Sequence, residues 1–108
     1  MLAVIFEVEM HPGRDQDYFE LAGSLKPELE AIDGFFSVER FQSVSNEGKY
    51  VSVSFWRDEE AVKAWREHAE HRIAQARGKK EIFADFRIRV AEVRRDYTLA
   101  DSRVRVRD

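Results

Sequence analysis

Residues 50–77, YVSVSFWRDEEAVKAWREHAEHRIAQAR, change from a sequence period of two to a period of three to four, and this change decides the fold. The first seven residues alternate in the way that is typical of a strand. Asp58 is a suitable helix cap, and two glutamates follow it in the first helical turn. The apolar face of this helix consists of Val62, Trp65, Ala69, Ile73 and Ala76. The pattern predicts a helix that runs to about Arg77 and ends at Gly78.

Three further segments alternate with a period of two and complete a set of four predicted strands. Together with residues 50–56, the strands occupy residues 2–10, 35–43 and 82–97. A first helix, capped by Asp15 or Asp17, carries apolar residues at three- and four-residue steps and is stopped by Asp33-Gly34. Short connections join these elements in the order βαββαβ. This order predicts an α+β, ferredoxin-like fold with an antiparallel sheet and both helices on one face.

Apolar side chains are also expected on the face of the sheet that the helices leave uncovered. The side chains of the third strand expected to face the helices are Val51, Val53 and Phe55. The outward set of that strand is then Tyr50, Ser52, Ser54 and Trp56. On the last strand, Phe83 is expected to share the outward face. A second copy that packs sheet against sheet would cover this face, so the sequence predicts a homodimer.

The composition fits a single small domain and excludes several classes of protein. The 108 residues suffice for one domain, predicted over residues 1–97, with residues 98–108 as a tail or a short added strand. The charges are mixed, with 18 Lys and Arg against 21 Asp and Glu, so no nucleic-acid partner is expected. Cysteine is absent, which excludes disulfides and thiolate chemistry. No apolar run approaches the ~20 residues of a spanning helix, and no signal peptide is recognisable, so we expect a cytoplasmic protein without membrane contact.

Several features of residues 52–97 together resemble a known family. Phe55-Trp56 closes a strand, and Asp58-Glu59-Glu60 opens a helix that contains Trp65. The remaining features are Ala74-Gln75 before Gly78, and Arg89-Val90-Ala91 running on to Arg95-Asp96-Tyr97. Over about residues 1–97 the chain resembles the antibiotic biosynthesis monooxygenase (ABM) family. The resemblance implies a ferredoxin-like protomer that dimerises through its sheets into an α/β barrel.

The resemblance also implies an activity. Some family members oxidise polycyclic phenols to quinones with oxygen and without a metal or cofactor, so we expect a cofactor-independent monooxygenase acting on a small aromatic or quinone-type compound. The alternative is a non-catalytic, dimeric domain that binds a small ligand or is related to stress. Haem-degrading relatives need an axial histidine late on the second helix and an asparagine on the first strand. The matching positions here offer Gln75 and either Phe6 or Glu7, which disfavours haem degradation.

Candidate site residues lie mainly on the second helix. Trp65 is expected to form a pocket wall for a flat ligand, beside a polar stripe of His68, His71 and Gln75. His71 or His68 is the candidate base, because imidazole accepts a proton near neutral pH. The alternative interpretation is a solvated helix face beside a core tryptophan. No metal site is predicted, because the acidic neighbours do not share one helix face with both histidines.

Arg87 is the remaining catalytic candidate. It alternates with apolar residues on the last strand and would stabilise a phenolate or a carboxylate in the pocket. The alternative is that Arg87 pairs with an acid such as Asp85 across the dimer. Trp56 and Phe6 complete the predicted substrate-binding set.

Overall fold

The computed structural model describes residues 1–75 and 82–101, with only the backbone of residues 74 and 75. The order βαββαβ is confirmed. The four strands are β1 (Leu2–Met10), β2 (Phe35–Gln42), β3 (Lys49–Trp56) and β4 (Phe83–Glu92). The two helices are α1 (Asp15–Glu30) and α2 (Glu59–Gln75). The predicted ferredoxin-like protomer is therefore correct, although β4 ends five residues earlier than the predicted strand.

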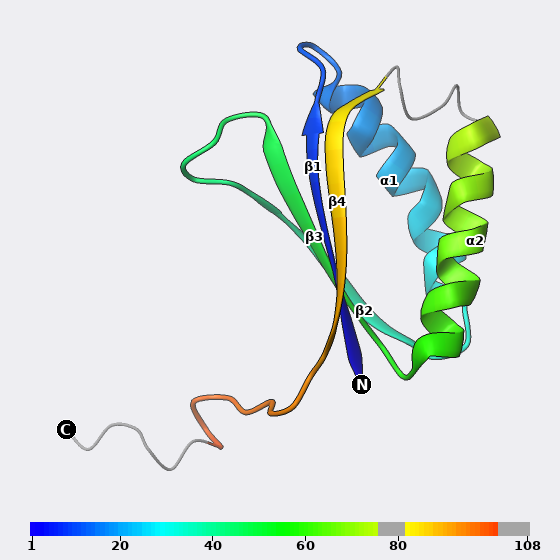
Figure 1. Ribbon diagram of the computed structural model, residues 1–108, viewed down its shortest axis with the longest axis vertical. Coiled ribbons are helices and arrows are strands. Elements are labelled where there is room, and N and C mark those ends of the chain that lie inside the picture. The colour runs from blue at the N-terminus through cyan, green and yellow to red at the C-terminus, as the bar shows by residue number, and fades with distance from the viewer. Residues whose placement is uncertain (76–81, 102–108) are drawn as a thin grey trace.

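The four strands form one antiparallel sheet in the order β2-β3-β1-β4. Both helices lie side by side on one face of this sheet, and neither of them covers the other face (Figure 1). In β1, one of the two inner strands of the sheet, Phe6 lies between Ser52 of β3 and Ile88 of β4. Directly paired residues point to the same face of a sheet, so all three of these side chains share one face. We call this helix-covered side the inner face.

The side-chain orientation predicted for β3 is wrong. Trp56 is completely buried, Tyr50 and Ser54 are also buried, and Ser52 pairs with the inward Phe6. The outer face instead carries Val51, Val53 and Phe55. The physical reason is the pairing with β1, which places Tyr50 and Ser54 beside Val8 and Val4, two of the most buried residues. Phe83 is likewise buried on the inner face, because the register with β1 shifts between Glu9 and Met10.

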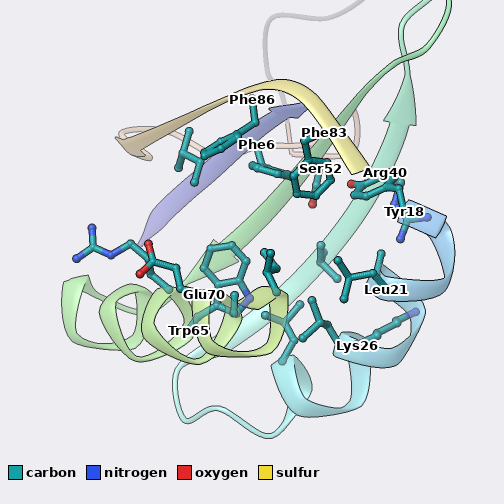
Figure 2. A pocket seen from close by; sticks show the side chains of 18 residues that line it. Phe6, Tyr18, Leu21, Lys26, Arg40, Ser52, Trp65, Glu70, Phe83 and Phe86 are labelled. Atoms are coloured by element: carbon teal, nitrogen blue, oxygen red, sulfur yellow. The ribbon is translucent and has the colours of Figure 1, made fainter. Parts of the chain in front are cut away.

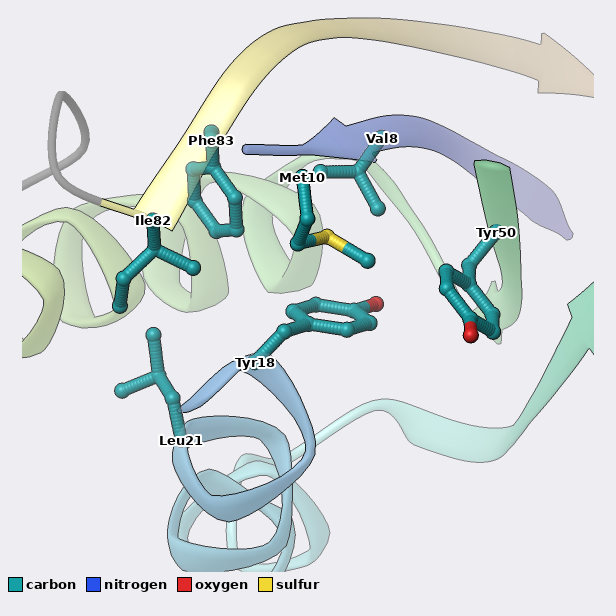
Figure 3. Packing of buried hydrophobic residues seen from close by; sticks show 7 residues of the cluster. All are labelled: Val8, Met10, Tyr18, Leu21, Tyr50, Ile82 and Phe83. Atoms are coloured by element: carbon teal, nitrogen blue, oxygen red, sulfur yellow. The ribbon is translucent and has the colours of Figure 1, made fainter. Parts of the chain in front are cut away.

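The core consists of two clusters of buried residues between the sheet and the helices. The first cluster, shown in Figure 3, comprises Val8, Met10, Tyr18, Leu21, Tyr50, Ile82 and Phe83. The second comprises Val4, Leu29, Trp56, Ala61 and Val62. Residues from both clusters border the space between them, which holds the cavity described below.

The ends of the elements show which capping predictions hold. The Ala61 amide donates a hydrogen bond to Asp58 Oδ1 at 3.0 Å, so Asp58 caps α2 as predicted. Neither aspartate caps α1, because Arg14 occupies the cap position and makes no capping hydrogen bond with its side chain. Gly34 turns the chain after α1 with a φ of +95°.

The remaining predictions about the chain ends concern α2 and the tail. The predicted end of α2 near Gly78 lies outside the described residues, and so does a strand within residues 102–108. Residues 99–101 form a turn. Neither of the two described helices is long and apolar enough to cross a membrane.

Candidate functional site

A cavity of about 200 Å³ lies between the inner face of the sheet and the two helices (Figure 2). Its walls come from all six elements. The apolar lining comprises Phe6, Leu21, Ala22, Leu25, Leu29, Val38, Trp65, Ala69, Ile73, Phe83, Phe86 and Ile88. The polar or charged lining comprises Tyr18, Lys26, Arg40, Ser52, Arg66 and Glu70. Small-molecule pockets in proteins commonly measure about 300–1,000 Å³, so this cavity suits a compact ligand.

Ser52 explains why a cavity exists at this position. The inner face of β3 carries large side chains at its two ends, Tyr50 and Trp56, and both are buried. Between them stand the smaller Ser52 and Ser54. Ser54 accepts a 2.8 Å hydrogen bond from the Trp56 indole N–H, while Ser52 lines the cavity. A small side chain beneath two separated helices leaves a volume that the surrounding apolar residues do not fill.

One end of the cavity is polar. Arg40 of β2 is the direct cross-strand partner of Ser52, so both side chains lie on the inner face. The Arg40 guanidinium carbon lies 5.3 Å from the centre of the Tyr18 ring and 5.5 Å from that of Phe19. Figure 2 shows Arg40, Ser52 and Tyr18 together along one part of the cavity rim. Burial raises the pKa of Tyr18 above its ordinary value of 10.0, and Arg40 offsets part of this increase.

The charges that line the cavity are mainly positive. Lys26, Arg40 and Arg66 contribute three positive charges, and Glu70 contributes one negative charge. The whole chain, in contrast, has a formal net charge of −3. A cavity lined in this way attracts an anion in preference to a cation.

The opposite end of the cavity is aromatic. Trp65 of α2 is partly buried and lines the cavity, as expected for a pocket wall. Its ring centre lies 5.8 Å from that of Trp56, with the ring planes tilted by 45°. Trp56 is fully buried and does not line the cavity, so it supports the wall from behind. Phe6 reaches the cavity, and its ring lies 5.9 Å from that of Phe86.

The structure does not bring the two candidate histidines to the cavity. His68 Nε2 lies 2.8 Å from Glu28 Oε1 of α1, and Arg72 contacts the same carboxylate at 3.0 Å. These three residues join α1 to α2. His71 is exposed, and neither histidine belongs to the cavity lining. The side chain of Gln75 lies outside the described residues.

Arg87 lies on the other side of the sheet from the cavity. It pairs with Glu7 of β1, and these two residues border a polar hollow together with Glu9, Lys49 and Asp85. Glu7 also contacts Arg89, and its carboxylate lies 3.1 Å from the Lys49 amine. The hydrogen bond from Lys49 is the main reason that the pKa of Glu7 is lowered. Arg87 therefore belongs to a charged cluster of the outer face.

Sequence reasoning missed the polar end of the cavity. Arg40 and Ser52 lie on the hairpin strands, whereas the polar candidates predicted from the sequence belong to the second helix and the last strand. A signal was available, because an arginine and a serine that face each other across a hairpin share one face of the sheet. Within residues 1–75 and 82–101, no cluster of three or more His, Asp or Glu side chains is arranged to hold a metal ion.

The fold and the cavity define an α+β protein with a ferredoxin-like protomer and a largely apolar cavity between its sheet and helices. Residues 1–77 match the family described as antibiotic biosynthesis monooxygenase, and this match covers more than half of the chain. The protein therefore belongs to the ABM family, as the resemblance implied.

Two relatives match most of the chain in sequence. The jasmonate monooxygenase ABM of Pyricularia oryzae is 43% identical over 93 residues, which are 86% of this chain and 43% of the fungal protein. The uncharacterized protein YqjZ of Bacillus subtilis is 31% identical over 93 residues, which are 86% of this chain and 79% of YqjZ. The matched segment thus spans less than half of the fungal relative.

A solved structure supports the fold independently. Rv0793 from Mycobacterium tuberculosis is 20% identical to this chain, and the two superpose with a TM-score of 0.76. The superposition covers 90% of this chain and 98% of Rv0793.

Proposed function

We propose that the protein is a monooxygenase that oxidises a small, largely apolar ring compound with molecular oxygen, inside the cavity between the sheet and the helices. The observation that carries this proposal is the cavity itself, which has a long apolar wall and one polar end in a chain of the ABM family. Trp65, Phe6 and Phe86 provide aromatic surfaces against which a flat ring would stack.

The reaction proposed needs no cofactor, because the substrate supplies the electrons. A phenol with a hydrogen on the ring carbon opposite its hydroxyl loses the phenolic proton to a base. The electron-rich ring carbon then forms a bond to one atom of O₂. Loss of the proton from that carbon and cleavage of the O–O bond leave a quinone, and the second oxygen atom departs as water. An apolar cavity favours this sequence, because it excludes water from the reactive anion.

Glu70 is the proton acceptor in this proposal. It is the sole carboxylate among the described residues that line the cavity, whereas His68 and His71 stand outside the lining. His68 is also held by Glu28 at 2.8 Å. A base must lie within hydrogen-bond reach of the proton that it removes, so the geometry favours Glu70 over both histidines.

The active form in this proposal is a homodimer that packs through the outer face of the sheet. The partly buried side chains Ile5, Val51, Val53 and Phe55 lie on this face, and neither α1 nor α2 covers them. Burial of such a face against a second copy excludes water from a continuous apolar surface. Sedimentation is expected to show a dimer that Val53→Asp converts to a monomer. A wild-type monomer of 12.7 kDa at micromolar concentration would contradict this assembly.

Oxygen consumption tests the activity. The purified protein is to be mixed with a panel of phenols and naphthols that carry a hydrogen on the ring carbon opposite the hydroxyl, without added cofactor and then with NADH and flavin. The fungal relative is named for jasmonate, so jasmonate belongs in the panel. We expect uptake of one O₂ per quinone formed, and loss of about 10²–10⁴-fold in rate for Glu70→Gln.

Two variants complete the test of the base. His71→Ala is expected to keep the wild-type rate, because the histidine lies outside the cavity lining. If His71→Ala loses activity while Glu70→Gln remains fully active, then His71 and not Glu70 is the proton acceptor. Tight binding of ring compounds without oxygen uptake, both in the absence of cofactor and with NADH and flavin, would identify a ligand-binding domain without catalysis.

A further inference from the structure

We infer that the polar end of the cavity is an oxyanion subsite, in which Arg40, with Ser52 and Tyr18, recognises a carboxylate or another ionised oxygen on the ligand. This inference rests on the proposed function in one respect, namely that the cavity is where the substrate binds. It adds a chemical class to that substrate: an apolar ring compound that carries a negative charge at one end.

Arg40 differs from most other arginines near the two helices in what surrounds it. Arg14, Arg57 and Arg72 each lie within ion-pair distance of a carboxylate. No carboxylate within residues 1–75 and 82–101 lies within 4.0 Å of Arg40, and its close neighbours are the faces of the Tyr18 and Phe19 rings. A guanidinium carries five N–H donors and no acceptor, and contact with a ring face leaves the donors at its edge for an anion.

Two hydroxyl groups stand beside this guanidinium. Ser52 is the cross-strand partner of Arg40, and Tyr18 lies under its guanidinium. Both residues line the same cavity, and Figure 2 shows all three around one part of it. A hydroxyl donates one hydrogen bond, so Ser52 and Tyr18 supplement the donors of Arg40. Three donor groups from β2, β3 and α1 thus converge where one charged oxygen group would lie.

The lining charges agree with an anionic ligand. Lys26 and Arg66 also line the cavity, and Glu70 is the one acidic residue among its described walls. Glu70 and Trp65 come from α2, on the other side of the cavity from Arg40 (Figure 2). A ligand whose oxyanion contacts Arg40 therefore places its ring against Trp65 and directs its far end toward Glu70. In this orientation Arg40 fixes the charged end and Glu70 stands near the reacting end.

Fluorescence of the cavity-wall tryptophan provides a direct test. The full chain is titrated at neutral pH with 2-naphthoate, with its neutral counterpart 2-naphthamide, and with 2-naphthol. We expect 2-naphthoate to bind more tightly than 2-naphthamide. Arg40→Met is expected to weaken naphthoate binding about ten- to hundredfold and to leave naphthamide binding nearly unchanged, since a hydrogen bond to a charged group is lost.

Two further variants separate the charge from the geometry. Arg40→Lys keeps the positive charge, so it is expected to retain part of the preference for naphthoate. The rest of the preference is lost, because an ammonium lacks the planar, two-pronged donor geometry of a guanidinium. Lys63→Met, on the exposed side of α2, also removes one positive charge and is expected to leave both affinities as in the wild type. A thermal denaturation curve is to be recorded for each variant, to check that the variant is folded. Tighter binding of 2-naphthol than of 2-naphthoate, lost in Arg40→Met, would identify the oxyanion as a phenolate.

The outcomes distinguish this inference from the proposed function. Equal affinity for naphthoate and naphthamide, or a preference that survives in folded Arg40→Met, overturns the oxyanion subsite, whether or not oxygen is consumed. Failure of both ring compounds to bind overturns it as well. A preference that depends on Arg40, found in a protein that consumes no oxygen with any substrate, supports the subsite and contradicts the monooxygenase proposal.

Discussion

Replacement of Trp65 by alanine tests whether this side chain is a cavity wall or a part of the closed core. Trp56 offers a matched comparison, because the two rings are in contact and differ mainly in what lies on their other sides. Trp56 is 0% exposed and donates its indole N–H to Ser54 Oγ at 2.8 Å. Trp65 is partly buried, and one side of it borders the cavity.

The expected cost differs between the two substitutions. A fully buried tryptophan changed to alanine costs about 3–5 kcal/mol of unfolding free energy, so Trp56→Ala should lie in that range. Either substitution also loses the contact between the rings, which is worth about 0.5–1.5 kcal/mol. Trp65 has no packing partner where its ring borders the cavity, so the transfer and packing losses are smaller there. We expect about 2 kcal/mol for Trp65→Ala.

Urea denaturation followed by circular dichroism measures both costs without relying on tryptophan emission. The two variants should differ by at least about 1 kcal/mol, or about 4 °C in melting temperature for a domain of this size. Trp65→Ala should also weaken the binding of 2-naphthoate, since its stacking surface is gone. A cost for Trp65→Ala that equals or exceeds that for Trp56→Ala, with unchanged ligand binding, would refute the assignment of Trp65 to a cavity wall.

Three other outcomes are expected. Gly34→Ala should cost about 2–4 kcal/mol of unfolding free energy in chemical denaturation, because φ is +95° and the new Cβ would lie 2.7 Å from Ala61 Cβ. Gly13→Ala is the control: its φ is +81°, but the space around it is open, so the cost should be about 1–2 kcal/mol. Tyr18→Phe should reduce the loss of stability above about pH 10, measured as melting temperature against pH. Because the pKa of Tyr18 is raised in the folded protein, the unfolded chain loses the Tyr18 hydroxyl proton at a lower pH than the folded chain does. A Tyr18→Phe variant whose melting temperature falls with pH as in the wild type would contradict this explanation. Titration with haem should give no sharp Soret shift; a stoichiometric shift abolished by His71→Ala would show histidine ligation.

The sequence predicts the order of the elements well, because each element has a clear period and a clear end. Phe6 was predicted to contact the substrate, and the structure places it on the inner face and in the cavity lining. The cap at Asp58 was also recognisable, because a short carboxylate before two glutamates meets the free amides of a first helical turn. These features depend on local sequence, so they can be predicted without knowledge of the partner strands.

The face of β3 could not be predicted in the same way. Val51 and Val53 are as apolar as the inward residues of any strand, so hydropathy alone favours them for the core. The structure instead buries Tyr50 and Trp56, whose rings are larger and whose polar atoms find partners. Tyr50 donates to Asp15 at 2.8 Å, and the Trp56 indole donates to Ser54. Pairing with β1 fixes this choice, and pairing is not visible within a single strand.

The same choice of face decides where the site lies. With Val51 and Val53 turned inward, the middle of β3 would fill the space under the helices and leave little room for a ligand. With Ser52 inward, the space stays open, and the residue directly across the hairpin, Arg40, lies on its edge. The orientation of the β3 side chains thus leaves the cavity open, and the pairing of β3 with β2 places the Arg40 guanidinium beside it. Arg87 lies on the outer face for a separate reason, because the register between β1 and β4 pairs it with Glu7 and not with the inward Phe6. An error of one residue in the orientation of one strand therefore exchanges the inward and outward side chains of that strand, and the hairpin pairing, more than the helix motif, determines which polar groups can meet a substrate.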